Sequence, residues 1–104
     1  MTLKEFGALI ATVDPKARRY QSAQRGDFTV WEEYSRIPAY ADGRTEGGWH
    51  VQLERYTKKE DDEIAEALRT LLESRDDVAF SYMIDTEKDG ESLTSRHLFD
   101  CEVW

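Results

Sequence analysis

The chain has 104 residues, and its 22 acidic and 14 basic side chains give a formal net charge of −8 at pH 7. This length predicts a single domain over residues 1–104 with one hydrophobic core. The negative charge repels a phosphate backbone and argues against specific nucleic-acid binding. No run reaches the roughly 18 apolar residues of a membrane span, and the N-terminus lacks a secretory-signal pattern, so we expect no membrane contact.

The only cysteine, Cys101, cannot form an internal disulfide, which fits a reducing compartment. A local basic cluster exists in the first quarter of the chain, at Lys16, Arg18, Arg19 and Arg25. Neither an aromatic platform nor a glycine-rich phosphate loop accompanies it. We therefore expect a protein inside the cell that does not read nucleic acid.

The first 13 residues predict an amphipathic helix. Thr2 and Glu5 form T-x-x-E, a capping box in which each side chain satisfies a backbone N–H at the helix start. Pro15 ends the helix, because its ring disfavours the helical conformation of the preceding residue, Asp14. The apolar residues recur at helical spacing, and they are Leu3, Phe6, Leu9, Ile10 and Val13.

The next three segments are less regular. Residues 16–26 are polar, and either a loop or a short irregular strand fits them. Residues 28–34 are rich in aromatic and β-branched side chains and predict a strand. Both of its faces are mixed, which is typical of an edge strand or of a strand that meets another subunit. Residues 36–48 contain Pro38 and several glycines and predict a long loop, for which a docking role and plain disorder both remain open.

A change of period within residues 49–72 marks the middle of the chain. Residues 49–56 alternate between apolar and polar side chains and predict a half-buried strand. Thr57 and Glu60 form a second T-x-x-E box, which predicts that a helix with an acidic first turn starts there. One apolar stripe follows at helical spacing, formed by Ile64, Leu68, Leu71 and Leu72.

The C-terminal third predicts a β-hairpin after the helix ends near Ser74. Residues 88–91 give the turn signal, and residues 93–104 form the last strand. The first strand of the hairpin has an apolar face formed by Val78, Phe80, Tyr82 and Ile84. The predicted fold is α+β, with an N-terminal helix, a mainly antiparallel sheet of about four strands, one amphipathic helix packed on a sheet face, and a C-terminal hairpin.

The candidate catalytic residues do not form a site. His97 and Cys101 are four residues apart, so in a strand their Cα atoms lie roughly 13 Å apart, too far to share a metal or a proton. We interpret Cys101 as a small buried side chain, His97 as partly wet near the strand end, and His50 as a polar cross-strand neighbour. A hydrolase that uses His50 or His97 is an alternative. We expect no enzyme activity, no metal, no cofactor and no small-molecule substrate.

Three stretches carry a resemblance to a known family: MTLKEF at the start, WHVQLERYTKKEDDEIAEALRTLLE in the middle and LFDCEVW at the end. The order of elements resembles small tail-completion or minor tail proteins of phages and prophages, a group related to tail terminators and head-to-tail joining proteins. The segment from Lys16 to Gly48 departs from that pattern, because it is polar and interrupted by glycines.

The resemblance implies a structural subunit without catalysis, which forms a ring of about six copies at the end of the tail tube nearest the head. Its partners would be itself, the tail tube protein and the head connector proteins. It would lie in the host cytoplasm during assembly and then in the virion. Aromatic side chains and the long loop supply the candidate interface residues, which are Trp31, Tyr34, Ile37, Tyr40, Arg44 and Trp104.

A second hypothesis follows from charge alone. A small acidic protein-binding module, or an inhibitor, docks on a basic partner through its negative surface. The two hypotheses differ in the partner: the first predicts copies of the same chain, and the second predicts a monomer that binds a basic protein in a salt-sensitive way.

Overall fold

The computed structural model describes residues 1–20, 26–40 and 46–104. Within them the fold is α+β, as predicted, with two helices and a mixed sheet. The elements in chain order are α1 (Leu3–Ala11), β1 (Arg18–Arg19), β2 (Phe28–Ile37), β3 (Gly48–Thr57), α2 (Glu63–Glu73), β4 (Val78–Asp89) and β5 (Ser92–Val103). The sheet has five described strands, in the order β1-β2-β3-β5-β4, where about four were expected.

The additional strand is β1, which arises in the segment for which a loop and a short strand both fitted. It is two residues long and runs parallel to β2, with Arg18 opposite Val30 and Arg19 opposite Trp31. Strand β2 is therefore paired on both sides at these positions, and the prediction of an edge strand is wrong there. The other pairs are antiparallel, and β4 and β5 form the predicted hairpin, with Gly90 in its turn at φ 63°.

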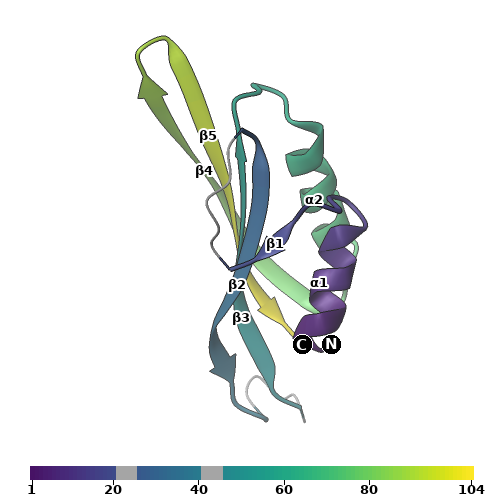
Figure 1. The fold of residues 1–104 in the computed structure, drawn as a ribbon. Helices are drawn as coiled ribbons and strands as arrows, with labels where there is room; N and C mark the ends of the chain where they lie inside the picture. The colour runs from purple at the N-terminus through teal and green to yellow at the C-terminus, as the bar shows by residue number, and fades with distance from the viewer. Residues whose placement is uncertain (21–25, 41–45) are drawn as a thin grey trace.

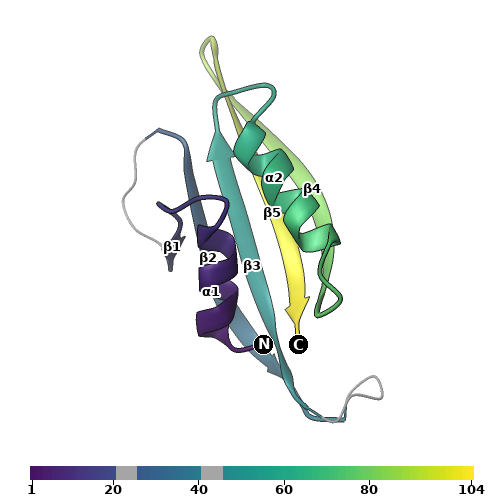
Figure 2. The same ribbon diagram turned by 90° about the vertical axis from the view of Figure 1, so that its right-hand side faces the viewer.

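Both helices lie on the same face of the sheet, α1 over β2 and β3 and α2 over β4 and β5 (Figure 2). We call this the covered face, and the opposite one, on which neither described helix lies, the open face (Figure 1). The core fills the space between the sheet and the helices, and it consists of Phe6, Ile10, Trp31, Val51, Leu53, Leu68, Leu72, Val78, Phe99, Cys101 and Val103.

Helix α1 begins with the predicted capping box, in which Thr2 and Glu5 exchange side-chain and backbone hydrogen bonds. Its apolar stripe packs on Trp31, whose ring meets the edge of Phe6 at 5.3 Å between centroids. Gly7 permits this contact, because a Cβ there would lie 2.8 Å from Cζ2 of Trp31. Trp31 is only 5% exposed. The expectation of an exposed interface residue is therefore wrong for Trp31, since α1 covers it.

Helix α2 begins later than predicted. Its N-cap is Asp62 rather than Thr57. The Asp62 side chain accepts a hydrogen bond from the N–H of Ala65. Thr57 is the last residue of β3, and its hydroxyl accepts the N–H of Lys59 while donating to Asp27. The second T-x-x-E box therefore matches the sequence pattern without forming a cap, because the strand continues through its first residue. The helix ends at Glu73 with Ser74 as its C-cap, close to the expected end near Ser74.

An ionic cluster is buried between the sheet and both helices. Arg55 of β3 is 4% exposed and points to the covered face. Its guanidinium contacts Asp62 at 2.9 Å, Asp14 at 3.6 Å and the hydroxyl of Thr29 at 3.4 Å. Burial raises the pKa of Asp62, but the hydrogen bonds from Arg55 and from the N–H of Ala65 lower it more, so the net pKa is below its usual value. The cluster links the end of α1, the middle of the sheet and the start of α2.

The molecule is elongated, with extents of 50 × 23 × 22 Å. The β4–β5 hairpin projects past the helices at one end, and β2 and β3 project at the other end (Figure 1). Ile84, on the predicted apolar face of β4, is exposed, as is Leu93 on β5. None of the described helices is long and apolar enough to span a membrane.

Candidate protein-binding face

The open face is formed by rows of side chains that run across β2, β3, β5 and β4. The register places them in four rows: Phe28, Tyr56, Arg96, Asp85; Val30, Glu54, Leu98, Met83; Glu32, Gln52, Asp100, Ser81; and Ser35, His50, Glu102, Ala79. The carboxylates on this face outnumber its described arginines, Arg18 and Arg96. The open face is therefore negative, with aromatic and aliphatic side chains between the charges.

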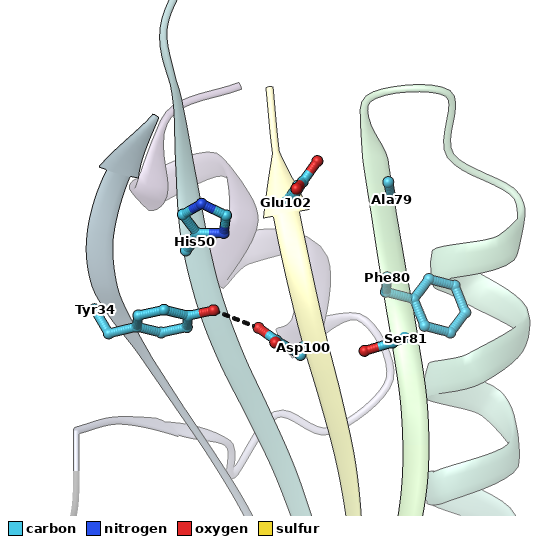
Figure 3. Close-up of a pocket in the computed structure, with 7 residues that line it drawn as sticks. All are labelled: Tyr34, His50, Ala79, Phe80, Ser81, Asp100 and Glu102. Atoms are coloured by element: carbon cyan, nitrogen blue, oxygen red, sulfur yellow. Dashed lines mark hydrogen bonds between the residues drawn. The ribbon is translucent and has the colours of Figure 1, made fainter. Parts of the chain in front are cut away.

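A β-bulge positions the aromatic residue at the centre of this face. The register shifts between Glu33 and Ser35, so Tyr34 is an extra residue in β2. Its ring stacks on His50 at 5.5 Å between centroids and an interplanar angle of 22°. Its hydroxyl donates to Oδ1 of Asp100 at 2.6 Å (Figure 3). That hydrogen bond raises the pKa of Tyr34 to about 12, so the phenol is neutral at physiological pH.

A hollow of about 340 Å³ lies beside this tyrosine. It is lined by Tyr34, His50, Ala79, Phe80, Ser81, Asp100 and Glu102. The small side chains of Ala79 and Ser81 border the hollow on one side. The rings of Tyr34 and His50 border it on the other side and form what we call the aromatic wall (Figure 3). Phe80 borders it through the main chain, because its ring points toward α2 and packs near Phe99. Two neighbouring carboxylates of β5, those of Asp100 and Glu102, lie between the two sides.

A second cluster on the open face has similar chemistry but contains its own cation. The hydroxyl of Tyr56 donates to Glu54 at 2.5 Å, and the ring stacks on Phe28 at 4.6 Å. Arg96 contacts Asp85 at 2.5 Å and Glu54 at 3.7 Å. Hydrogen bonding to Tyr56 and to Asp85 raises the pKa of Arg96. We call these residues, Tyr56, Glu54, Arg96 and Asp85, the arginine cluster.

In the hollow, no described cation takes the place that Arg96 has in the arginine cluster. Asp100 accepts from Tyr34 but has no ion-pair partner among the described residues, and neither has Glu102. The described residues also contain no group of His, Cys, Asp and Glu side chains that could hold a metal ion. The hollow thus presents two neighbouring carboxylates and an aromatic wall to solvent, an arrangement that can bind an organic cation.

Of the residues considered for catalysis, His50 lines the hollow, whereas His97 and Cys101 lie on the covered face. His97 is 8% exposed, within β5, and contradicts the expectation of a partly wet histidine near a strand end. It lies on the covered face, where its Nδ1 is 2.7 Å from the Tyr82 hydroxyl, and burial lowers its pKa. Burial also raises the pKa of the Cys101 thiol to about 12, so the thiol is protonated. His50 is on the open face beside Glu102, consistent with a polar cross-strand neighbour.

The predicted interface residues are spread over the molecule. Trp31 and Ile37 are buried, and Arg44 lies outside the described residues. Tyr40 is 76% exposed. Trp104 is half-buried, and its N–H donates to the carbonyl of Asp77. Tyr34 is the member of the set that lines the hollow.

Asp100 and Glu102 were not among the predicted site residues. Alternation along the last strand does place both on its more polar face, which is the signal that could have pointed to them. What the sequence did not provide is the pairing that puts this face beside His50 of β3.

No protein-family model matches the chain, and a search of the curated proteins finds no match either. The resemblance to tail-completion proteins therefore stays a prediction.

Proposed function

We propose that this chain is a protein-binding module without catalysis, which docks through its open face on a positively charged partner surface. The observation that supports this most is the excess of carboxylates on a sheet face that neither described helix covers. Charge complementarity of this kind speeds encounter and selects partners. No described cation pairs with Asp100 or Glu102, so their carboxylates are available to a cation of the partner.

The apolar part of the open face provides the rest of the interface. Phe28, Tyr56 and Leu98 are half-buried, and Met83 is exposed. Protein interfaces combine such an apolar centre with a polar rim, and tyrosine is enriched among their most important contacts. The module would thus offer a partner both a hydrophobic contact and a set of fixed negative charges.

The test maps where a basic probe binds. A synthetic peptide of alternating arginine and serine is titrated into the isotopically labelled full chain, and backbone amide shifts are followed by NMR. We expect shifts on β2, β3 and β5 that disappear as salt is added, because surface charges are screened. Shifts concentrated on α1 and α2 would overturn the proposal.

A pair of charge reversals provides the matched comparison. Glu102→Lys changes the open face, and Glu73→Lys makes the same change at an exposed position of α2. We expect Glu102→Lys to weaken peptide binding several-fold more than Glu73→Lys. Equal weakening would mean that net charge, and not this face, governs binding.

The second candidate function is the tail-completion subunit, a ring-forming structural protein that contacts a tail tube and a head connector. The projecting strands at both ends of the elongated molecule favour it, because such arms can reach neighbouring subunits. Tyr40, three residues after the end of β2, and Leu93, on the hairpin, are exposed.

Light scattering over a concentration series, with negative-stain images of any large species, tests this candidate. A ring that Tyr40→Ala or Leu93→Ser prevents from forming would support it. A chain that stays monomeric at every concentration would argue against it and favour the binding module.

A further inference from the structure

We propose that the hollow on the open face is a receptor for an arginine side chain of the partner. This inference rests on the proposed function, since it names the group that the acidic face recognises. The guanidinium would stack on the ring of Tyr34 and pair with the carboxylates of Asp100 and Glu102.

The arginine cluster of the same face provides the first argument. There, a tyrosine hydroxyl donates to a carboxylate, and Arg96 contacts that carboxylate and a second one from the neighbouring strand. In the hollow, the Tyr34 hydroxyl likewise donates to Asp100, and Glu102 supplies the second carboxylate. The hollow thus contains the same kinds of groups, a tyrosine and two acids, but no described arginine. Its two acids both lie on β5, whereas those of the arginine cluster lie on β3 and β4.

The charges in the hollow give the second argument. Asp100 and Glu102 are two residues apart on β5, so their side chains stand on the same face about 7 Å apart along the strand. Asp100 uses Oδ1 for the tyrosine and keeps Oδ2 for a new donor. A guanidinium carries five N–H donors in a planar fork, which allows it to reach carboxylates on two sides.

The aromatic wall distinguishes arginine from lysine. Tyr34 and His50 are stacked, and Tyr34 is 54% exposed, so ring surface is available to a ligand. A planar guanidinium stacks on such a ring and is weakly hydrated, whereas an ammonium is a compact and strongly hydrated charge. The volume of about 340 Å³ lies at the small end of ligand pockets, which suits one side chain.

The experiment uses two probes on the full chain: arginine and lysine, each with its amino terminus acetylated and its carboxyl terminus amidated. Amide shifts at Tyr34, Asp100 and Glu102 report binding. We expect the blocked arginine to bind at millimolar concentration, with shifts confined to the residues of the hollow, and the blocked lysine to bind at least about threefold more weakly. Equal binding of the two probes would overturn the inference.

Matched variants locate the site. Glu102→Gln removes a carboxylate from the hollow, and Glu87→Gln removes one from an exposed position of the same face outside it. We expect Glu102→Gln to weaken arginine binding about three- to fivefold and Glu87→Gln to leave it unchanged. Tyr34→Phe retains the stacking ring and should bind arginine nearly as well, whereas Tyr34→Ala should not. Loss of binding in both tyrosine variants, or equal loss in both glutamate variants, would contradict the model of the site.

The result separates this inference from the proposed function. If the basic peptide binds the open face while the blocked arginine does not enter the hollow, the docking face stands and the arginine receptor fails. If the peptide binds the helices while the blocked arginine still enters the hollow, the docking face fails and the receptor stands. If neither probe binds the open face, both are overturned.

Discussion

The buried ionic cluster on the covered face and the hollow on the open face differ in how their charges are balanced. On the covered face, Arg55 is buried and its guanidinium contacts Asp14, Asp62 and Thr29, so its charge is balanced inside the protein. On the open face, Asp100 and Glu102 lack a cation among the described residues. The buried cluster therefore contributes to stability, whereas under the proposed function the carboxylates of the hollow are left for a partner.

The strongest test of this contrast compares two adjacent residues of β5. Phe99 is fully buried on the covered face, and its replacement by alanine should lower the free energy of unfolding by about 3–5 kcal/mol. Leu98 is half-buried on the open face, and Leu98→Ala should lower it by only about 1 kcal/mol. Urea denaturation measures both, and losses of similar size would contradict the division into two faces.

The next effect concerns the buried ionic cluster. Asp62→Ala removes the principal partner of Arg55 and the N-cap of α2, so unfolding free energy should fall by about 3 kcal/mol. The neighbouring Glu63→Ala changes an exposed acid in the same helical turn and should change it by about 0.5 kcal/mol or less. If Asp62→Ala is as mild as Glu63→Ala, Arg55 does not depend on this partner.

A smaller effect should appear in the pH dependence of stability. Burial lowers the pKa of His97 below its usual value of 6.5, so the unfolded chain binds a proton more readily than the folded one. The stability that this pKa shift contributes is therefore fully present above pH 6.5, and it is lost as pH falls through the pKa that His97 has in the folded chain. In the His97→Gln variant, the melting temperature should fall less steeply with decreasing pH just below pH 6.5 than it does in the native chain. An unchanged slope in the His97→Gln variant would contradict this account of the histidine.

The smallest effect on stability should come from the hollow itself. Glu102→Gln and Tyr34→Ala should each change the free energy of unfolding by about 0.5 kcal/mol or less, because neither supports the core. Thermal melts check this directly. A loss of more than about 2 kcal/mol in either variant would mean that the open face is part of the folding framework.

The periodic parts of the fold were predictable, and the non-periodic parts were not. Alternation in β3 and β5 and the capping box of α1 follow from local physics, and the structure has them. The start of α2 was misplaced because a sequence motif cannot show that a strand continues through Thr57. The burial of Trp31 depends on the packing of α1 at Gly7, which is a tertiary contact.

The candidate site was less predictable than the fold for a related reason. The hollow needs a bulge at Tyr34, small residues on β4 and the pairing of β3 with β5. The bulge and the pairing are relations between separate segments of the sequence, and alternation within one strand reports only which residues share a side. The polar sides of β3 and β5 could be identified, but not their juxtaposition.

The outer strand of the hairpin, β4, also bears on how this sheet avoids the addition of further strands at its edge. Strand β4 is paired on one side, with β5, and its other edge is unpaired within the described sheet. Free edges of this kind can add further strands and lead to aggregation, and natural proteins protect them with charged side chains. Asp85, Glu87 and Lys88 stand exposed on β4, in its half toward the hairpin turn. Their charges would let the hairpin extend into solvent while keeping it from joining a fibril.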